Sequence, residues 1–79
     1  MTTVAISLDS IDKVKNFVNT IALYDCDFDL VSGRYIIDAK SIMGIFSLDL
    51  SKEISLNIHS DSAEEVGKIL AALKDYVSA

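Results

Sequence analysis

Several features that define common classes of small protein are missing from this chain. Cys26 is the only cysteine among 79 residues, which excludes a disulfide framework and a cysteine-based metal site. Seven basic residues stand against twelve acidic ones, and the net charge of −5 argues against nucleic acid or an anionic membrane as the main partner. No apolar run is long enough to span a bilayer and no signal peptide is apparent, so we expect a soluble cytoplasmic protein.

What is present indicates one folded domain over residues 1–79. Hydrophobic residues make up 51% of the chain, which is well within the range of globular proteins and argues against disorder. A chain of this length has room for one domain, and it contains no repeat, linker or low-complexity segment. Because so short a chain buries a modest fraction of its surface, nearly every apolar residue is expected to face inward.

The spacing of apolar residues predicts the element order βαββαβα. Alternation typical of half-buried strands is found at residues 3–8, 25–30, 35–39 and 54–59, with a turn signal at residues 32–34. Helical spacing predicts long helices over residues 11–24 and 62–77, and residues 41–48 suit a short helix. The first long helix is expected to bury one stripe of residues: Ile11, Val14, Val18, Ile21 and Ala22. Tightly joined strands with helices of these lengths predict an α+β open-faced sandwich, in which one antiparallel sheet is covered on one face.

The last helix has the clearest end signals. Ser62 and Glu65 match a capping box, in which the serine caps the helix and the glutamate side chain returns to the cap. Lys74 is expected in the last turn, where its charge suits the helix dipole.

Residues 40–48 are the most informative segment. They are mostly apolar and begin with Lys40 and Ser41, directly after a predicted strand. Ser41 is therefore expected at the start of the short helix. There it is either a plain N-cap or a phosphate acceptor, because free N–H groups and the helix dipole stabilise negative charge at that end.

This segment resembles the regulatory-serine segment of HPr, the phosphocarrier protein of the bacterial sugar phosphotransferase system. The resemblance is carried by residues 40–44 and by Ser47 and Leu48, and is supported by residues 24–27 and the element order. Asp49 departs from the glycine usual in the family. The resemblance implies an HPr-like sheet with two long helices and one short one. It also implies phosphorylation of Ser41 by an HPr kinase and a partner-binding surface made of Lys40, Ile42, Met43, Phe46 and Leu48.

The second HPr site is absent by the same alignment. In the family a histidine caps the first helix and is followed two and three residues later by arginine and proline; the matching positions here are Ser10, Asp12 and Lys13. Serine is a weak nucleophile without a nearby base, and Asp12 would repel phosphate. The only histidine, His59, lies at the end of the fourth predicted strand.

We therefore expect a regulatory or adaptor protein of the HPr family that is not an enzyme and needs no cofactor. The resemblance implies protein partners: an HPr kinase, a transcriptional regulator or enzymes of the sugar system. It also implies a monomer or a dimer formed by exchange of the first strand. The alternatives are a phosphocarrier that uses Ser10 as acceptor and a binding domain with an unrelated partner.

Three other features are expected to be structural. Asp25, Asp27 and Asp29 share one face of a strand, where a solvated sheet surface is a simpler explanation than a metal site, so we predict no metal. Cys26 is expected to be a small buried hydrophobe, and His59 a surface residue.

Overall fold

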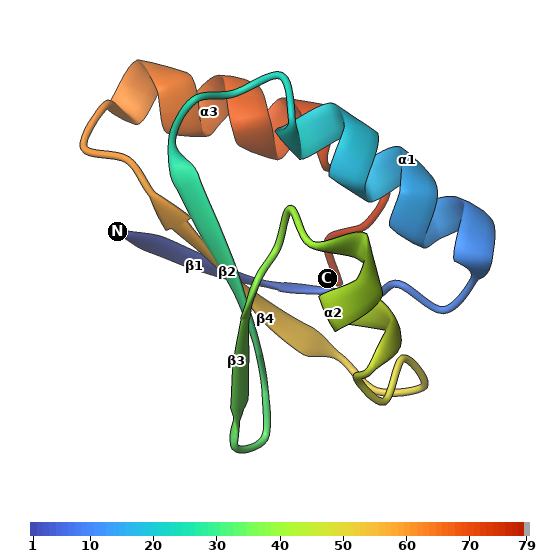
Figure 1. Ribbon diagram of the computed structural model, residues 1–79. Coiled ribbons are helices and arrows are strands. Elements are labelled where there is room, and N and C mark those ends of the chain that lie inside the picture. Colours follow the sequence, from blue (N-terminus) through green and yellow to red (C-terminus); the bar gives the residue numbers. More distant parts are fainter. Residues whose placement is uncertain (79) are drawn as a thin grey trace.

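The computed structural model describes residues 1–78, which form the predicted order of strands and helices (Figure 1). The strands are β1 (Thr2–Ile6), β2 (Asp27–Ser32), β3 (Tyr35–Asp38) and β4 (Ile54–His59), and the helices are α1 (Ile11–Ile21), α2 (Ile42–Phe46) and α3 (Ala63–Ala72). All strand pairs are antiparallel, in the order β1-β4-β2-β3. The helices lie on one side of this sheet, which confirms the predicted open-faced sandwich.

The alternation within β2 and β4 creates the two faces of the sheet. Phe28 and Leu30 of β2 point toward the helices and are buried, as are Ile54, Leu56 and Ile58 of β4. The polar residues between them lie on the open face. The buried core contains residues from the sheet, the helices and their connections: Ile6, Leu8, Val14, Phe17, Ile21, Phe28, Leu30, Ala39, Ile45, Leu48, Ile54, Leu56, Ile58, Ile69 and Leu73.

Helix α1 differs from the prediction in its buried stripe and in its end. It buries Val14, Phe17 and Ile21, whereas Ile11 and Ala22 are exposed. Phe17 contacts the Tyr76 ring edge to face, with the centroids 5.9 Å apart. After Ile21 the backbone bonds shorten to three-residue turns, such as that from Leu23 N–H to Thr20 O, so the helix does not reach residue 24.

Helix α3 starts at the predicted cap, but half of the capping box is not formed. The Ser62 hydroxyl accepts a hydrogen bond from Glu65 N–H, as expected. The Glu65 carboxylate, however, accepts from the Ser60 hydroxyl, and the Ser60 Oγ accepts from Ser62 N–H in its place. The Ser60 hydroxyl therefore links Ser62 N–H to the Glu65 carboxylate, which the capping box would join directly. Lys74 lies beyond the helix end at Ala72, so it does not occupy the last turn.

Candidate functional site

Ser41 lies at the start of α2, as the sequence predicted. Its backbone is extended and its Oγ accepts a hydrogen bond from Gly44 N–H at 3.2 Å. The side chain is exposed. A Cβ at position 44 would lie 3.1 Å from this Oγ, which is tighter than most such contacts. Glycine at position 44 therefore leaves room for the Ser41 side chain.

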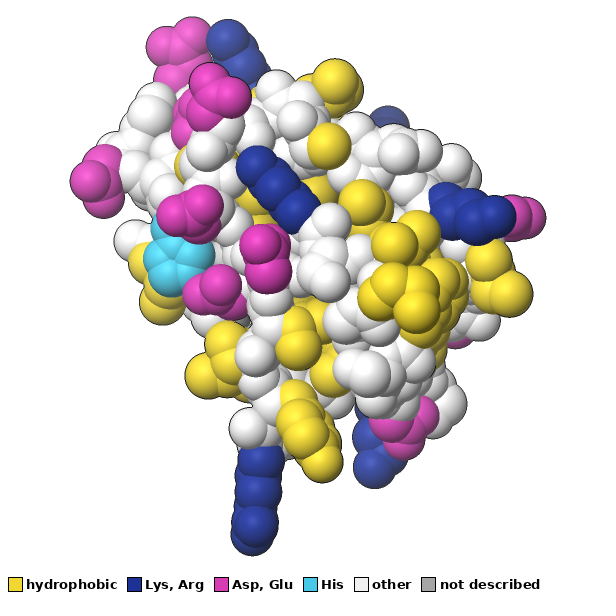
Figure 2. All heavy atoms as spheres, in the orientation of Figure 1, with side chains coloured by type: hydrophobic (Ala, Val, Ile, Leu, Met, Phe, Trp, Pro, Cys, Tyr) yellow, Lys and Arg dark blue, Asp and Glu magenta, His cyan; other side chains and the backbone are white. Residues whose placement is uncertain are grey.

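Apolar side chains stand exposed beside Ser41. Met43 is 77% exposed and Phe46 is 39% exposed, while Ile42 is half-buried against the core. We call Ser41, Ile42, Met43 and Phe46 the α2 surface. Figure 2 shows apolar side chains gathered over α2, at the edge of the helical layer. The exposed Ser41 hydroxyl thus adjoins the exposed apolar side chains of Met43 and Phe46.

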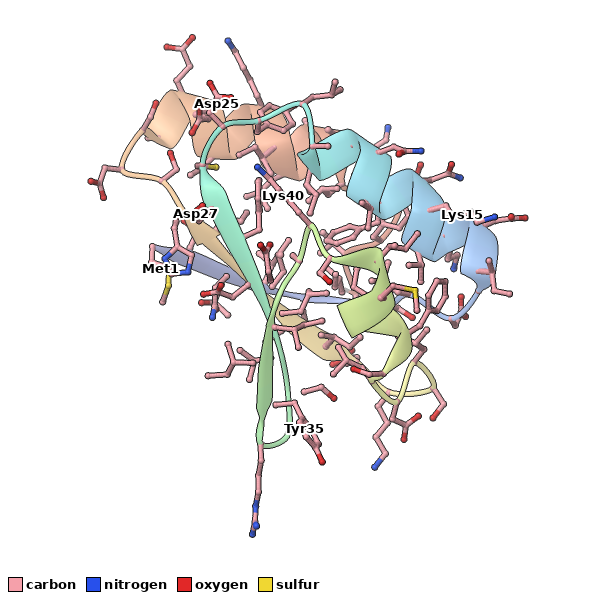
Figure 3. All side chains as sticks on the ribbon, viewed as in Figure 1. Met1, Lys15, Asp25, Asp27, Tyr35 and Lys40 are labelled. Carbon is pink, nitrogen blue, oxygen red and sulfur yellow. The ribbon has the colours of Figure 1, made fainter. Side chains whose placement is uncertain are left out.

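Two residues predicted for this surface are engaged elsewhere. Leu48 is only 8% exposed and packs in the core, because the chain turns inward after α2. The Lys40 ammonium donates to the Tyr24 carbonyl oxygen at 2.8 Å and lies 5.6 Å from the centre of the Phe28 ring. Figure 3 shows Lys40 directed between the sheet and α1. Lys40 thus ties the segment before α2 to the connection between α1 and β2. Leu48 does not belong to the exposed surface.

Ser10 is also an N-cap serine, at the start of α1. Its Oγ accepts a hydrogen bond from Lys13 N–H at 3.1 Å. The Lys13 ammonium donates a hydrogen bond to Asp9 Oδ1 at 2.9 Å. This side-chain hydrogen bond, together with the positive charge of Lys13, lowers the pKa of Asp9. Asp12 is exposed in the first turn. The charge of Lys13 is thus paired with a carboxylate, and a second carboxylate lies in the same turn.

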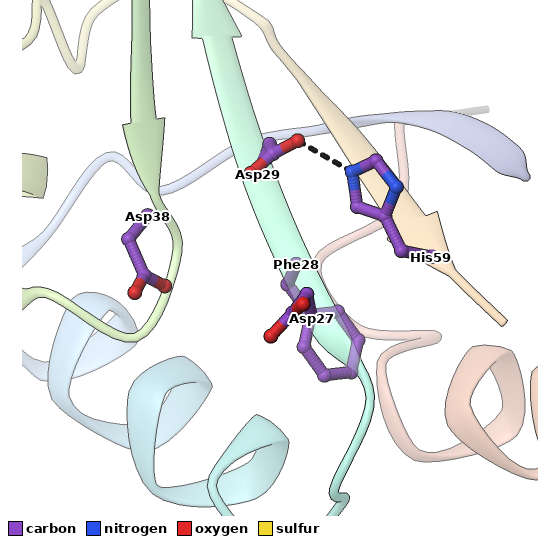
Figure 4. Close-up of a pocket in the computed structure, with 5 residues that line it drawn as sticks. All are labelled: Asp27, Phe28, Asp29, Asp38 and His59. Carbon is purple, nitrogen blue, oxygen red and sulfur yellow. Dashed lines mark hydrogen bonds and ion pairs between the residues drawn. The ribbon is translucent and has the colours of Figure 1, made fainter.

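His59 lies on the open face of the sheet, away from the helices. Asp29 Oδ2 accepts a hydrogen bond from His59 Nε2 (Figure 4). Asp27 is opposite His59 across β2 and β4, and Asp38 is opposite Asp29 across β2 and β3. These carboxylates line one shallow depression with the ring. Among residues 1–78, no group of three or more such side chains has the geometry to hold a metal ion.

Cys26 is half-buried just before β2, and so is less enclosed than the sequence predicted. Loss of solvent and the nearby Glu65 carboxylate raise the pKa of its thiol. Cys26 packs against the core from its edge, consistent with a small apolar role.

The family model for the PTS HPr component phosphorylation site matches residues 13–79. The chain belongs to the HPr family. The HPr-family match begins at Lys13 and so does not include Ser10. No curated protein sequence matches the chain at a significant level.

Two solved HPr structures resemble the chain over nearly its whole length. HPr-C-His from Thermoanaerobacter tengcongensis is 28% identical, with a TM-score of 0.74, over 95% of this chain and 92% of that one. The phosphocarrier protein HPr from Bacillus anthracis str. Ames is also 28% identical, with a TM-score of 0.68, over 98% of this chain and 94% of that one. The HPr-like fold is therefore confirmed. In the part of the chain that the structure describes, no helix is long and apolar enough to cross a membrane.

Proposed function

We propose that this HPr-family chain is a regulatory adaptor that presents the α2 surface to protein partners. Phosphorylation of Ser41 controls that binding, and no phosphoryl group is carried on a histidine. The observation that carries the proposal is the exposed Ser41 hydroxyl beside the exposed side chains of Met43 and Phe46. In this role the chain binds and is modified, and it catalyses no reaction itself.

The surroundings of Ser41 support a switch. Ser41 is exposed, and α2 has no acidic residue in its first turn. A phosphate there adds a charge of about −1.5 to −2 within reach of a surface that otherwise offers apolar anchors. After phosphorylation, a partner that binds through a fully desolvated apolar contact loses affinity for the α2 surface. A partner with arginine or lysine facing Ser41 gains affinity. HPr kinase, transcriptional regulators and sugar-system enzymes are the partners that the family implies.

The surroundings of Ser10 and His59, the two other possible phosphoryl acceptors, support the proposal that neither of them carries a phosphoryl group. Ser10 has no described base within hydrogen-bond distance to activate its hydroxyl, and its one hydrogen bond caps α1. His59 contacts Asp29 and shares its depression with Asp27 and Asp38, whose negative charges oppose the approach of a phosphoryl donor. Neither residue combines a nucleophile with a positive environment.

Incubation with an HPr kinase and ATP, followed by intact-mass and peptide mass spectrometry, tests the modification. We expect one phosphoryl group on Ser41 and none after Ser41→Ala. Ser47→Ala is the matched control, because Ser47 is the serine at the other end of α2 and its hydroxyl bonds to Gly44 O. Unmodified wild-type protein, or equal loss of phosphate in both variants, would refute Ser41 as the acceptor.

Incubation with the first enzyme of the phosphotransferase system and phosphoenolpyruvate tests the second half of the proposal. No phosphoryl group is expected on Ser10 or His59, whereas an ordinary HPr in the same mixture is labelled. Label on either residue would show that the chain still carries phosphate.

A further inference from the structure

The two edges of the sheet differ in what covers them. At the β1 edge, Ser7 N–H donates to Tyr76 O at 2.8 Å and Ser78 N–H donates to Ala5 O at 2.9 Å. Val77 forms an isolated bridge with Ile6. The last residues described thus satisfy part of the β1 backbone. No comparable segment pairs with β3 within residues 1–78, so β3 presents an open edge.

The turn before β3 determines which backbone groups point out of the sheet. Gly33 has φ +60°, and no described residue other than glycine has positive φ, which matches a type II′ turn with Gly33 and Arg34 at its centre. Such a turn makes Ser32 and Tyr35 a hydrogen-bonded pair. The N–H and C=O groups of Ile36, one residue later, therefore point away from β2. They have no described backbone partner.

Apolar side chains accompany these free groups. Tyr35 and Ile36 are each 70% exposed, on opposite faces of β3. Figure 1 shows the β2–β3 hairpin extending beyond the helical layer, and Figure 3 shows Tyr35 near its tip. An edge strand with exposed apolar side chains is a template for pairing with another strand.

The charges on β3 and its turn are self-complementary. Arg34, in the turn, and Asp38, the last residue of β3, are both exposed and lie two residues on either side of Ile36. If two copies pair antiparallel with Ile36 opposite Ile36, each Arg34 lies opposite Asp38 of the second copy. A shift by two residues in one direction would place Arg34 opposite Lys40, and in the other direction opposite Ile36. Of these three registers, only the one centred on Ile36 therefore places Arg34 opposite Asp38.

We infer that two copies of this chain associate through their β3 edges, antiparallel and centred on Ile36, into one continuous sheet that joins the four strands of each copy. The interface is isologous, with the two-fold axis perpendicular to the sheet and the helices of both copies on the same side. It contains the two Ile36 side chains in contact, Tyr35 beside Ile37 of the other copy, and two Arg34–Asp38 pairs. The inference does not depend on the proposed function, since it involves neither Ser41 nor any phosphate.

Sedimentation velocity over a range of protein concentrations tests this dimer. The wild-type chain is expected to dimerise with rising concentration, and Arg34→Asp and Asp38→Arg are each expected to weaken self-association about tenfold or more, because each places like charges in opposition twice. Mixed together, the two variants are expected to form a heterodimer, since one chain then carries carboxylates at both positions and the other carries guanidinium groups at both. Lys15→Asp is the matched control, because it makes a comparable charge reversal on the exposed face of α1 and should leave self-association unchanged.

Two further measurements separate charge repulsion from loss of folding. Asp38 Oδ1 accepts a hydrogen bond from Lys40 N–H at 2.9 Å, so Asp38→Asn retains an acceptor there while removing the charge, and is expected to weaken the dimer less than Asp38→Arg. Circular dichroism should show each variant folded. A wild-type chain that stays monomeric at every concentration would overturn the inference. So would a dimer unaffected by Arg34→Asp and Asp38→Arg, which would favour exchange of β1 instead.

Discussion

The starts of α1 and α2 are alike in backbone geometry and unlike in their surroundings. In both, a serine in extended conformation accepts a hydrogen bond from the N–H three residues later, at Lys13 for Ser10 and at Gly44 for Ser41. Around Ser10 lie a paired lysine and an acidic first turn. Around Ser41 lie a glycine and exposed apolar side chains. The caps alone therefore do not distinguish the two serines, whereas the neighbouring side chains do.

The largest expected effect comes from introducing the histidine, arginine and proline of the HPr family at the start of α1. We expect Ser10→His, Asp12→Arg and Lys13→Pro together to change the chain from one that accepts no phosphoryl group from phosphoenolpyruvate and the first enzyme to one that does. The histidine supplies a nucleophilic nitrogen, and the arginine supplies positive charge for the phosphate. Acid-labile label, measured on the folded triple variant, is the readout. An unlabelled triple variant would mean that these three positions do not explain the difference between the helix starts.

Two glycines allow the crowding at Ser41 to be measured against a matched position. Gly67 lies in α3, and a Cβ at this position would have no neighbouring atom within 4 Å, so Gly67→Ala should raise the free energy of unfolding by about 0.5–1 kcal/mol. Gly44→Ala should raise the free energy of unfolding by less, or lower it, because the added Cβ would lie 3.1 Å from Ser41 Oγ. Urea denaturation measures both. Equal stabilisation by the two substitutions would show that the space beside Ser41 is not limiting.

The similarity of the two caps predicts similar stability costs. Ser10→Ala and Ser41→Ala should each lower the free energy of unfolding by about 1 kcal/mol, since each leaves one helix N–H without its side-chain acceptor. Urea denaturation of both variants and the wild-type chain under the same conditions would test this. A much larger cost at Ser41 would indicate that its hydroxyl contributes more to the fold than a cap.

The smallest expected effect is a titration at the start of α1. The pKa of Asp9 is lowered in the folded chain by Lys13, so the contribution of this pair is present above the ordinary aspartate pKa and is lost as the pH falls through the lowered value. In Lys13→Met the pKa of Asp9 should return toward the ordinary aspartate value. Carboxyl chemical shifts measured against pH provide the test, and an unchanged Asp9 titration would show that Lys13 is not its partner in solution.

Periodicity in the sequence was sufficient for the element order, the sheet faces and the position of Ser41, because these depend on local alternation and capping. It was not sufficient for Lys40, whose partner is a carbonyl oxygen sixteen residues away. Nor could it place Leu48, which turns into the core only because of how the chain leaves α2, or Phe17, which lies between Val14 and Ile21 in the buried stripe. Nor does the sequence show that β3 is an edge strand, on which the complementarity of Arg34 and Asp38 depends.

Affinity capture with wild type, Ser41→Ala and Ser41→Asp as baits tests the central claim most directly. Each bait is exposed to extract from the source cells, and the retained proteins are compared by quantitative mass spectrometry. Ser47→Asp, at the C-cap of α2, is the matched control. The adaptor account predicts that Ser41→Asp gains or loses specific partners relative to Ser41→Ala, whereas Ser47→Asp retains the wild-type set. Identical partner sets for all four baits would contradict it.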